Sequence, residues 1–139
     1  MKRNFYELAE EDLIWAENML LFPDPPSYNQ IALLARQSAE KYLKHMQVLN
    51  GLFDFSAEKQ THNISLSRRT LERHGFSEMG REKITEACAF LDNYRTNIEY
   101  PGDNFLSVSS DDAENSVNFA KIVKDVVDYI IIKKEGAKK

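Results

Sequence analysis

The residues best suited to chemistry are two charged side chains that stand where the helical pattern requires apolar ones. Asp12 projects from the apolar half of a helix predicted over residues 4–22, and Arg95 projects from the apolar face of one predicted over 77–98. An unpaired charge inside a protein is strongly unfavourable, so each needs a partner. We expect Arg95 to pair with Asp12, with Lys41 as the second candidate. Such a pair either fixes helix register or belongs to a polar pocket that receives a phosphate or nucleotide.

A second polar set lies on a helix predicted over residues 28–50. It consists of Gln37, Lys41 and Lys44, flanked by Arg36 and Glu40. Glu40 precedes Lys44 by four residues, which is the favourable orientation for an ion pair along a helix. The set forms either a solvated face or a cationic surface toward a ligand or a protein partner. We take Gln37, Lys41 and Lys44 as candidate ligand-binding residues.

Other kinds of site find little support in the sequence. His62 precedes Asn63 at the start of a short helix predicted over 63–74, which the two residues are expected to cap. We keep His62 as a further candidate ligand-binding residue. No histidine spacing supports a metal site, no glycine-rich phosphate loop is present, and the single Cys88 lies on an apolar face. We therefore predict neither a metal nor a cofactor.

Helices must position these residues. The chain has 139 residues, enough for one domain, and only 5 Gly and 4 Pro, which leaves long uninterrupted stretches. Apolar residues recur with a helical period, and the core stripes of the first two helices include Trp15 and Leu49. We predict an all-α, antiparallel up-and-down bundle of four long helices and one short helix. Its ranges are 4–22, 28–50, 63–74, 77–98 and 110–132, with Ser110 as the cap of the last helix and Gly51 and Gly75 as helix stops.

Composition and charge limit the number of domains, the class of ligand and the location that we expect. We predict one domain over residues 1–132 and a basic, frayed tail over 133–139. The formal net charge of −4 excludes a globally basic nucleic-acid binder but not a local basic patch. The longest apolar run, residues 126–132, contains Asp128, so no membrane span is expected. One cysteine cannot form an internal disulfide, and no signal peptide is apparent, so a cytoplasmic location is expected.

The first and last helices also carry apolar residues on their outer faces. Ile14 and Leu21 are seven residues apart, and Ile122, Val126 and Tyr129 follow one another at helical spacing. Stripes of this kind indicate a second buried surface. A homodimer through these two helices is the simplest explanation.

Several strings of the sequence resemble the HEPN domain, a nucleotide-binding helical bundle of higher eukaryotes and prokaryotes. The closest match is Gln37-Ser38-Ala39-Glu40-Lys41-Tyr42-Leu43-Lys44, which is similar to that family's Gln-x-Ala-Glu-Lys-x-Leu-Lys signature. The other strings are Asp12-Leu13-x-x-Ala16-x-x-x-Leu20, His62-Asn63-Ile64-Ser65-Leu66, Arg95 with Tyr100-Pro101, and a last helix with Ala113 and Ala120. Together they cover nearly the whole chain.

The resemblance implies a dimer with a polar site near its cleft, and often a small nucleotidyltransferase as partner in a toxin–antitoxin-like pair. The ribonuclease branch of the family uses Arg-x4–6-His on the scissile phosphate and its 2′-hydroxyl. Here four residues separate Arg95 from Tyr100, which stands in place of that histidine. A tyrosine has a reference pKa near 10, so it can donate a hydrogen bond but is a poor general base.

Three functions follow from these observations. In the first, a dimeric HEPN-like module binds a nucleotide or an RNA phosphate, or is the partner of a nucleotidyltransferase. Arg95, Lys41 and Lys44 then supply cationic donors, Tyr100 a ring or hydroxyl, and Asp12 orients Arg95. In the second, the chain is a metal-independent ribonuclease in which Arg95 stabilises the transition state and Tyr100 or His62 is an imperfect acid and base. In the third, the chain is a homodimeric interaction bundle without a ligand.

Overall fold

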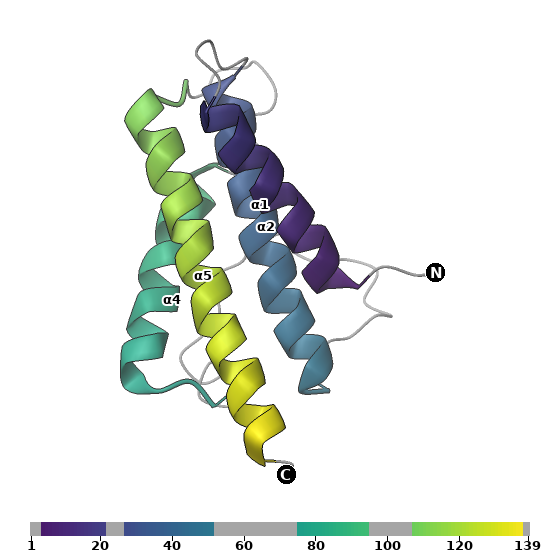
Figure 1. Cartoon of the computed structure of the whole chain (residues 1–139). Helices are drawn as coiled ribbons and strands as arrows, with labels where there is room; N and C mark the ends of the chain where they lie inside the picture. The colour runs from purple at the N-terminus through teal and green to yellow at the C-terminus, as the bar shows by residue number, and fades with distance from the viewer. Residues whose placement is uncertain (1–3, 22–26, 52–74, 95–106, 138–139) are drawn as a thin grey trace, which may run out of the picture.

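The computed structural model describes residues 4–21, 27–51, 75–94 and 107–137. These residues form four α-helices and one short 3-10 helix, and they contain no strand, so the described part of the chain is all-α. The helices are α1 (Phe5–Leu21), α2 (Tyr28–Leu49), α4 (Glu78–Leu91), η1 (Asp92–Tyr94) and α5 (Ser110–Ala137). The α-helices pack side by side along one long direction (Figure 1). The short helix predicted over 63–74 lies outside the described residues.

Each α-helix begins with a side-chain cap. In each case the cap side chain accepts a hydrogen bond from the backbone N–H group three residues later. The pairs are Asn4 with Glu7 at 2.9 Å, Ser27 with Gln30 at 3.1 Å, Ser77 with Gly80 at 3.1 Å, and Ser109 with Asp112 at 3.1 Å. Such bonds satisfy the donors that the first turn leaves without a helical partner. The cap of α5 is therefore Ser109, one residue before the predicted Ser110.

The ends of the helices follow the sequence in part. Gly51 and Gly75 both have positive φ angles, +68° and +84°, the left-handed conformation that glycine adopts at little cost. This confirms the prediction of a glycine stop after α2. The helix α5 continues to Ala137, into the segment predicted to be a frayed tail. At the end of α4 the backbone tightens into η1.

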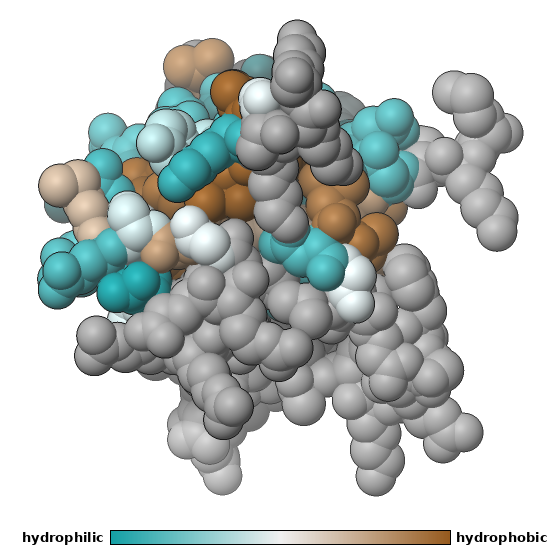
Figure 2. Space-filling model, turned by 90° about the horizontal axis from the view of Figure 1, so that it is seen from below, coloured by the Kyte–Doolittle hydropathy of each residue, from teal (hydrophilic) through white to brown (hydrophobic). Residues whose placement is uncertain are grey.

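The core lies where α2 meets α1 on one side and α5 on another, with α4 packed mainly against α5. Small residues allow α1 and α2 to approach closely, and the Ser38 hydroxyl donates a hydrogen bond of 2.7 Å to the Ala9 carbonyl. Tyr42, Leu43 and Met46 fill the centre of the bundle. Seen from below, apolar residues are visible between hydrophilic ones on the described part of this face (Figure 2). No helix in the described part of the chain is long and apolar enough to cross a membrane.

Two residues predicted to lie in the core are exposed instead. Trp15 is 57% exposed and Leu49 is 51% exposed. The buried stripe of α1 is narrow, since Ala9, Leu13 and Ala16 are its only fully buried residues within the described helix. Trp15 lies about 100° around the helix from Ala16, so it falls outside that stripe. Leu49 is the last residue of α2.

Candidate functional site

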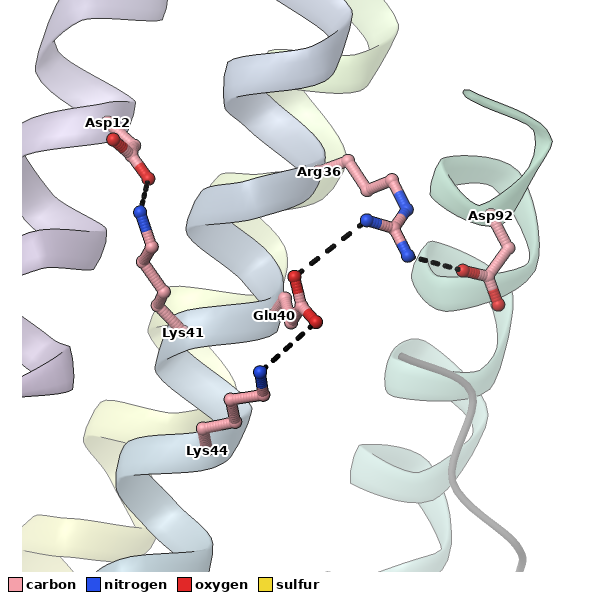
Figure 3. Close-up of polar contacts among 6 residues, drawn as sticks. All are labelled: Asp12, Arg36, Glu40, Lys41, Lys44 and Asp92. Atoms are coloured by element: carbon pink, nitrogen blue, oxygen red, sulfur yellow. Dashed lines mark hydrogen bonds and ion pairs between the residues drawn. The ribbon is translucent and has the colours of Figure 1, made fainter. Parts of the chain in front are cut away.

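Charged side chains leave α2 in two directions. Arg36, Glu40 and Lys44 are spaced by four residues and share one side of the helix. Lys41 leaves α2 on another side, toward α1 (Figure 3). The set predicted as one polar face is therefore divided between two neighbours.

The first group forms a continuous series of opposite charges. Lys44 Nζ lies 3.3 Å from Glu40 Oε1, and Arg36 Nη1 lies 3.8 Å from Glu40 Oε2. The other guanidinium nitrogen, Arg36 Nη2, lies 3.6 Å from Asp92 Oδ1 on η1. The planar guanidinium can face two carboxylates at once, so Arg36 joins α2 to η1 (Figure 3).

Burial distinguishes this series from an ordinary helix surface. Arg36 is 4% exposed and Glu40 is 8% exposed. Charges so deeply buried are retained only where opposite charges surround them. The expectation of a solvated face is therefore wrong for Arg36 and Glu40, because their side chains point toward η1 and are covered.

Asp12 and Lys41 form the second group. Lys41 Nζ donates a hydrogen bond to Asp12 Oδ2, with the lysine side chain 29% and the aspartate side chain 16% exposed. Lys41 was the second candidate partner of Asp12. Within the described residues the pair holds α1 against α2, on a different side of α2 from the Arg36 series (Figure 3).

The structure brings together only some of the predicted site residues. Gln37 is partly exposed on α2, and Lys44 belongs to the Arg36 series. Arg95, Tyr100 and His62 lie outside the described residues, as does the pairing of Arg95 with Asp12. Arg95 follows η1 directly in the sequence, three residues after Asp92.

Sequence reasoning named Arg36 only as a flanking residue of a polar face and did not name Asp92. For Arg36 a signal was available, because a helical projection places it about 20° from the buried Leu43. For Asp92 there was none, since its partner Arg36 is distant in the sequence and the turn into η1 determines where its carboxylate lies.

Three titratable groups elsewhere in the bundle have pKa values shifted toward their neutral forms. Burial raises the pKa of the Cys88 thiol to about 12, so it remains protonated at neutral pH and is not a nucleophile. Burial lowers the pKa of His45, whose ring packs against Tyr6 at a centroid distance of 5.4 Å. Burial, followed by a hydrogen bond to Asp128, raises the pKa of Tyr6. Among the described residues no three His, Cys, Asp or Glu side chains gather as metal ligands.

Comparison with known families identifies the family of the chain. The family model described as the HEPN domain matches residues 3–130, nearly the whole chain. The chain belongs to the HEPN domain family. The string 37–44, which carried the resemblance, places residues of this HEPN domain on three sides of α2: Glu40 toward η1, Lys41 toward α1 and Tyr42 in the core. No curated protein and no solved structure is significantly similar to the chain.

Proposed function

We propose that this HEPN domain binds the phosphate of a nucleotide or an RNA beside η1. The main support for the proposal is the series Lys44–Glu40–Arg36–Asp92, which has Arg36 and Glu40 buried at its centre and ends at η1. Arg95 comes next in the sequence. A buried guanidinium that holds Asp92 fixes the backbone from which the segment with Arg95 and Tyr100 starts, and such fixing of a supporting residue favours a preorganised site.

The residues divide into donors and supports. Arg95 supplies a planar guanidinium that can donate two parallel hydrogen bonds to a phosphate, and Lys44 supplies an ammonium. Gln37 and His62 are further polar contacts in this proposal, and Tyr100 donates a hydrogen bond or stacks its ring. Asp12 and Lys41 act as supports, because they are bonded to each other and hold α1 against α2.

Binding fits these residues better than cleavage does. The ribonuclease branch needs a histidine where this chain has Tyr100, and a phenol with a reference pKa near 10 is almost entirely protonated at neutral pH. It cannot accept a proton from a 2′-hydroxyl at a useful rate. We therefore propose a binding module, not an enzyme.

The proposal is tested by fluorescence anisotropy with a short labelled single-stranded RNA and a labelled adenine nucleotide in EDTA. Arg95→Ala is expected to weaken binding at least tenfold, and Lys44→Gln several-fold. Lys83→Ala, an exposed lysine on α4, is the matched control and should leave binding unchanged. Absence of binding by the wild type, or equal losses in Arg95→Ala and Lys83→Ala, would contradict the proposal. Cleavage of the RNA that Arg95→Ala abolishes would assign a ribonuclease instead.

We further propose that the domain dimerises through the outer faces of α1 and α5, as HEPN domains often do. Ile14, Leu21 and Tyr129 are 56%, 80% and 63% exposed, which is unusual for large apolar side chains at helical spacing. Light scattering should give a dimer for the wild type and a monomer for Leu21→Asp. Met79→Asp, at a position on α4 that is 66% exposed, should remain a dimer. A monomeric wild type at high micromolar concentration would contradict this proposal.

In the same proposal the protein partner is a small nucleotidyltransferase, as the family resemblance implies, and the location is the cytoplasm. The free, buried Cys88 is consistent with a reducing compartment. Co-expression with the adjacent gene product, followed by affinity purification, tests the partner directly.

A further inference from the structure

The side chain of Asn29 ties the start of α5 to the first turn of α2. Asn29 Oδ1 accepts a hydrogen bond of 2.8 Å from the backbone N–H of Val108, a residue 79 positions away in the sequence. Val108 is buried and directly precedes Ser109, whose side chain caps α5. A buried N–H group needs an acceptor, and here another helix supplies it. The place where α5 begins is therefore set by a side chain of α2.

Arg36 makes the corresponding contact at the end of α4. Its Nη2 lies 3.6 Å from Asp92 Oδ1 on η1. Asn29 and Arg36 are seven residues apart on α2, so they project within about 20° of each other and lie about 10.5 Å apart along the helix axis. One face of α2 therefore holds both Asp92 and Val108, which are distant from it in the sequence.

The two contacts lie on either side of the segment that carries the proposed phosphate donors. Arg95 and Tyr100 both fall between Asp92 and Val108 in the sequence. Holding both ends of a segment limits its conformations more than holding one end does, and it leaves less conformational entropy to be lost when a ligand binds. The contact of Asn29 with Val108 therefore favours a preorganised site in addition to supporting the fold.

We propose that Asn29 is a positioning residue for phosphate binding and acts through the backbone of Val108. The inference rests on the phosphate site proposed beside η1 and adds a second support to it. Arg36 holds the segment at η1, and Asn29 holds it at the start of α5. Without the hydrogen bond of Asn29, Arg95 loses most of its advantage as a phosphate donor.

The test is a double-mutant cycle on Asn29→Ala and Arg95→Ala, measured by fluorescence anisotropy with the labelled RNA. Asn29→Ala alone should weaken RNA binding about 3- to 10-fold. Arg95→Ala should weaken binding at least tenfold in the wild-type background, but less than about threefold in the Asn29→Ala background. A purely structural role of Asn29 predicts instead that the two effects multiply.

Two further variants separate positioning from a general loss of stability. Asn29→Asp keeps a side-chain oxygen that can accept from the N–H of Val108, so the tenfold effect of Arg95→Ala should persist in this background. Ser38→Ala is the matched control, because it removes another hydrogen bond from an α2 side chain to a distant backbone group, the 2.7 Å bond to the Ala9 carbonyl. It should lower the Tm of the free protein about as much as Asn29→Ala does, yet leave the effect of Arg95→Ala unchanged.

The outcomes distinguish this inference from the phosphate site on which it rests. An undiminished effect of Arg95→Ala in the Asn29→Ala background would overturn the role of Asn29 and leave the phosphate site standing. So would an equally diminished effect in the Ser38→Ala or Asn29→Asp background, or an Asn29→Ala protein that does not fold. A wild type in which Arg95→Ala changes nothing would overturn the phosphate site and this inference together.

Discussion

The two sides of α2 use the same kinds of charge in different surroundings. Toward η1, Arg36 is almost fully buried and faces two carboxylates, those of Glu40 and Asp92. Toward α1, Lys41 remains 29% exposed, and among the described residues it pairs with Asp12 alone. A guanidinium can serve two acceptors in one plane, whereas an ammonium on a flexible stem keeps part of its hydration. The difference indicates that the η1 side fixes geometry and that the α1 side mainly joins two helices.

The largest effect is expected for Arg36→Ala. It leaves the carboxylates of Glu40 and Asp92 without the guanidinium between them, and removing one partner from a buried ion pair costs about 3–5 kcal/mol. Urea unfolding measures this loss, with Lys83→Ala as a control that should stay within about 0.5 kcal/mol of the wild type. A loss below about 1 kcal/mol in Arg36→Ala would erase the contrast between the two sides of α2.

A smaller effect is expected on the α1 side. A double-mutant cycle on Asp12→Ala and Lys41→Ala should give a coupling of about 0.5–1 kcal/mol, because both side chains keep contact with water. The same cycle with Arg95→Ala in place of Lys41→Ala tests the first predicted partner of Asp12. A larger coupling to Arg95 than to Lys41 would show that the α1 side is organised differently from this account.

The smallest effect concerns His45, which packs against Tyr6 where α2 meets α1. Burial lowers its pKa below the ordinary value of 6.5, so below pH 6.5 the unfolded chain binds a proton that the folded chain resists. The contribution of the neutral His45 ring to the free energy of unfolding is therefore fully present above that pH. It is lost as the pH falls toward the lowered pKa of the folded state. Urea unfolding at pH 7.5 and 5.5 measures how much unfolding free energy is lost between the two pH values. This loss should be smaller in His45→Gln than in the wild type. Equal losses in the two proteins would remove His45 from the account.

Much of the fold followed from the sequence because helices repeat with a fixed period. The ranges of α1 and α2 and the buried residues Val117, Ala120, Val123 and Val127 of α5 agree with the structure. Trp15 was misplaced because periodicity gives the direction of a residue but not the width of the surface that a neighbour covers. Ser110 was chosen over Ser109 because either serine can cap, and only backbone geometry distinguishes them.

The candidate site could be predicted less well. Asp12 was recognised as needing a cation, and Lys41 was named as its second candidate, because a charge inside an apolar stripe is visible in sequence. Which cation pairs with Asp12 depends on how the helices are placed relative to one another. Residue spacing alone does not specify that placement. The cluster around Arg36 combines residues from α2 and η1, and long-range pairs of this kind leave no periodic signal.

The most direct test of the central claim is the salt dependence of RNA binding in wild type, Arg95→Ala and Lys121→Ala. These two variants remove one cation each, the first beyond η1 and the second on the α1–α5 side. For single-stranded RNA the slope of log K against log salt should become shallower by about 0.7 in Arg95→Ala, as expected for one lost phosphate contact, and should stay unchanged in Lys121→Ala. The reverse order, or no change in either variant, would contradict a phosphate site beside η1.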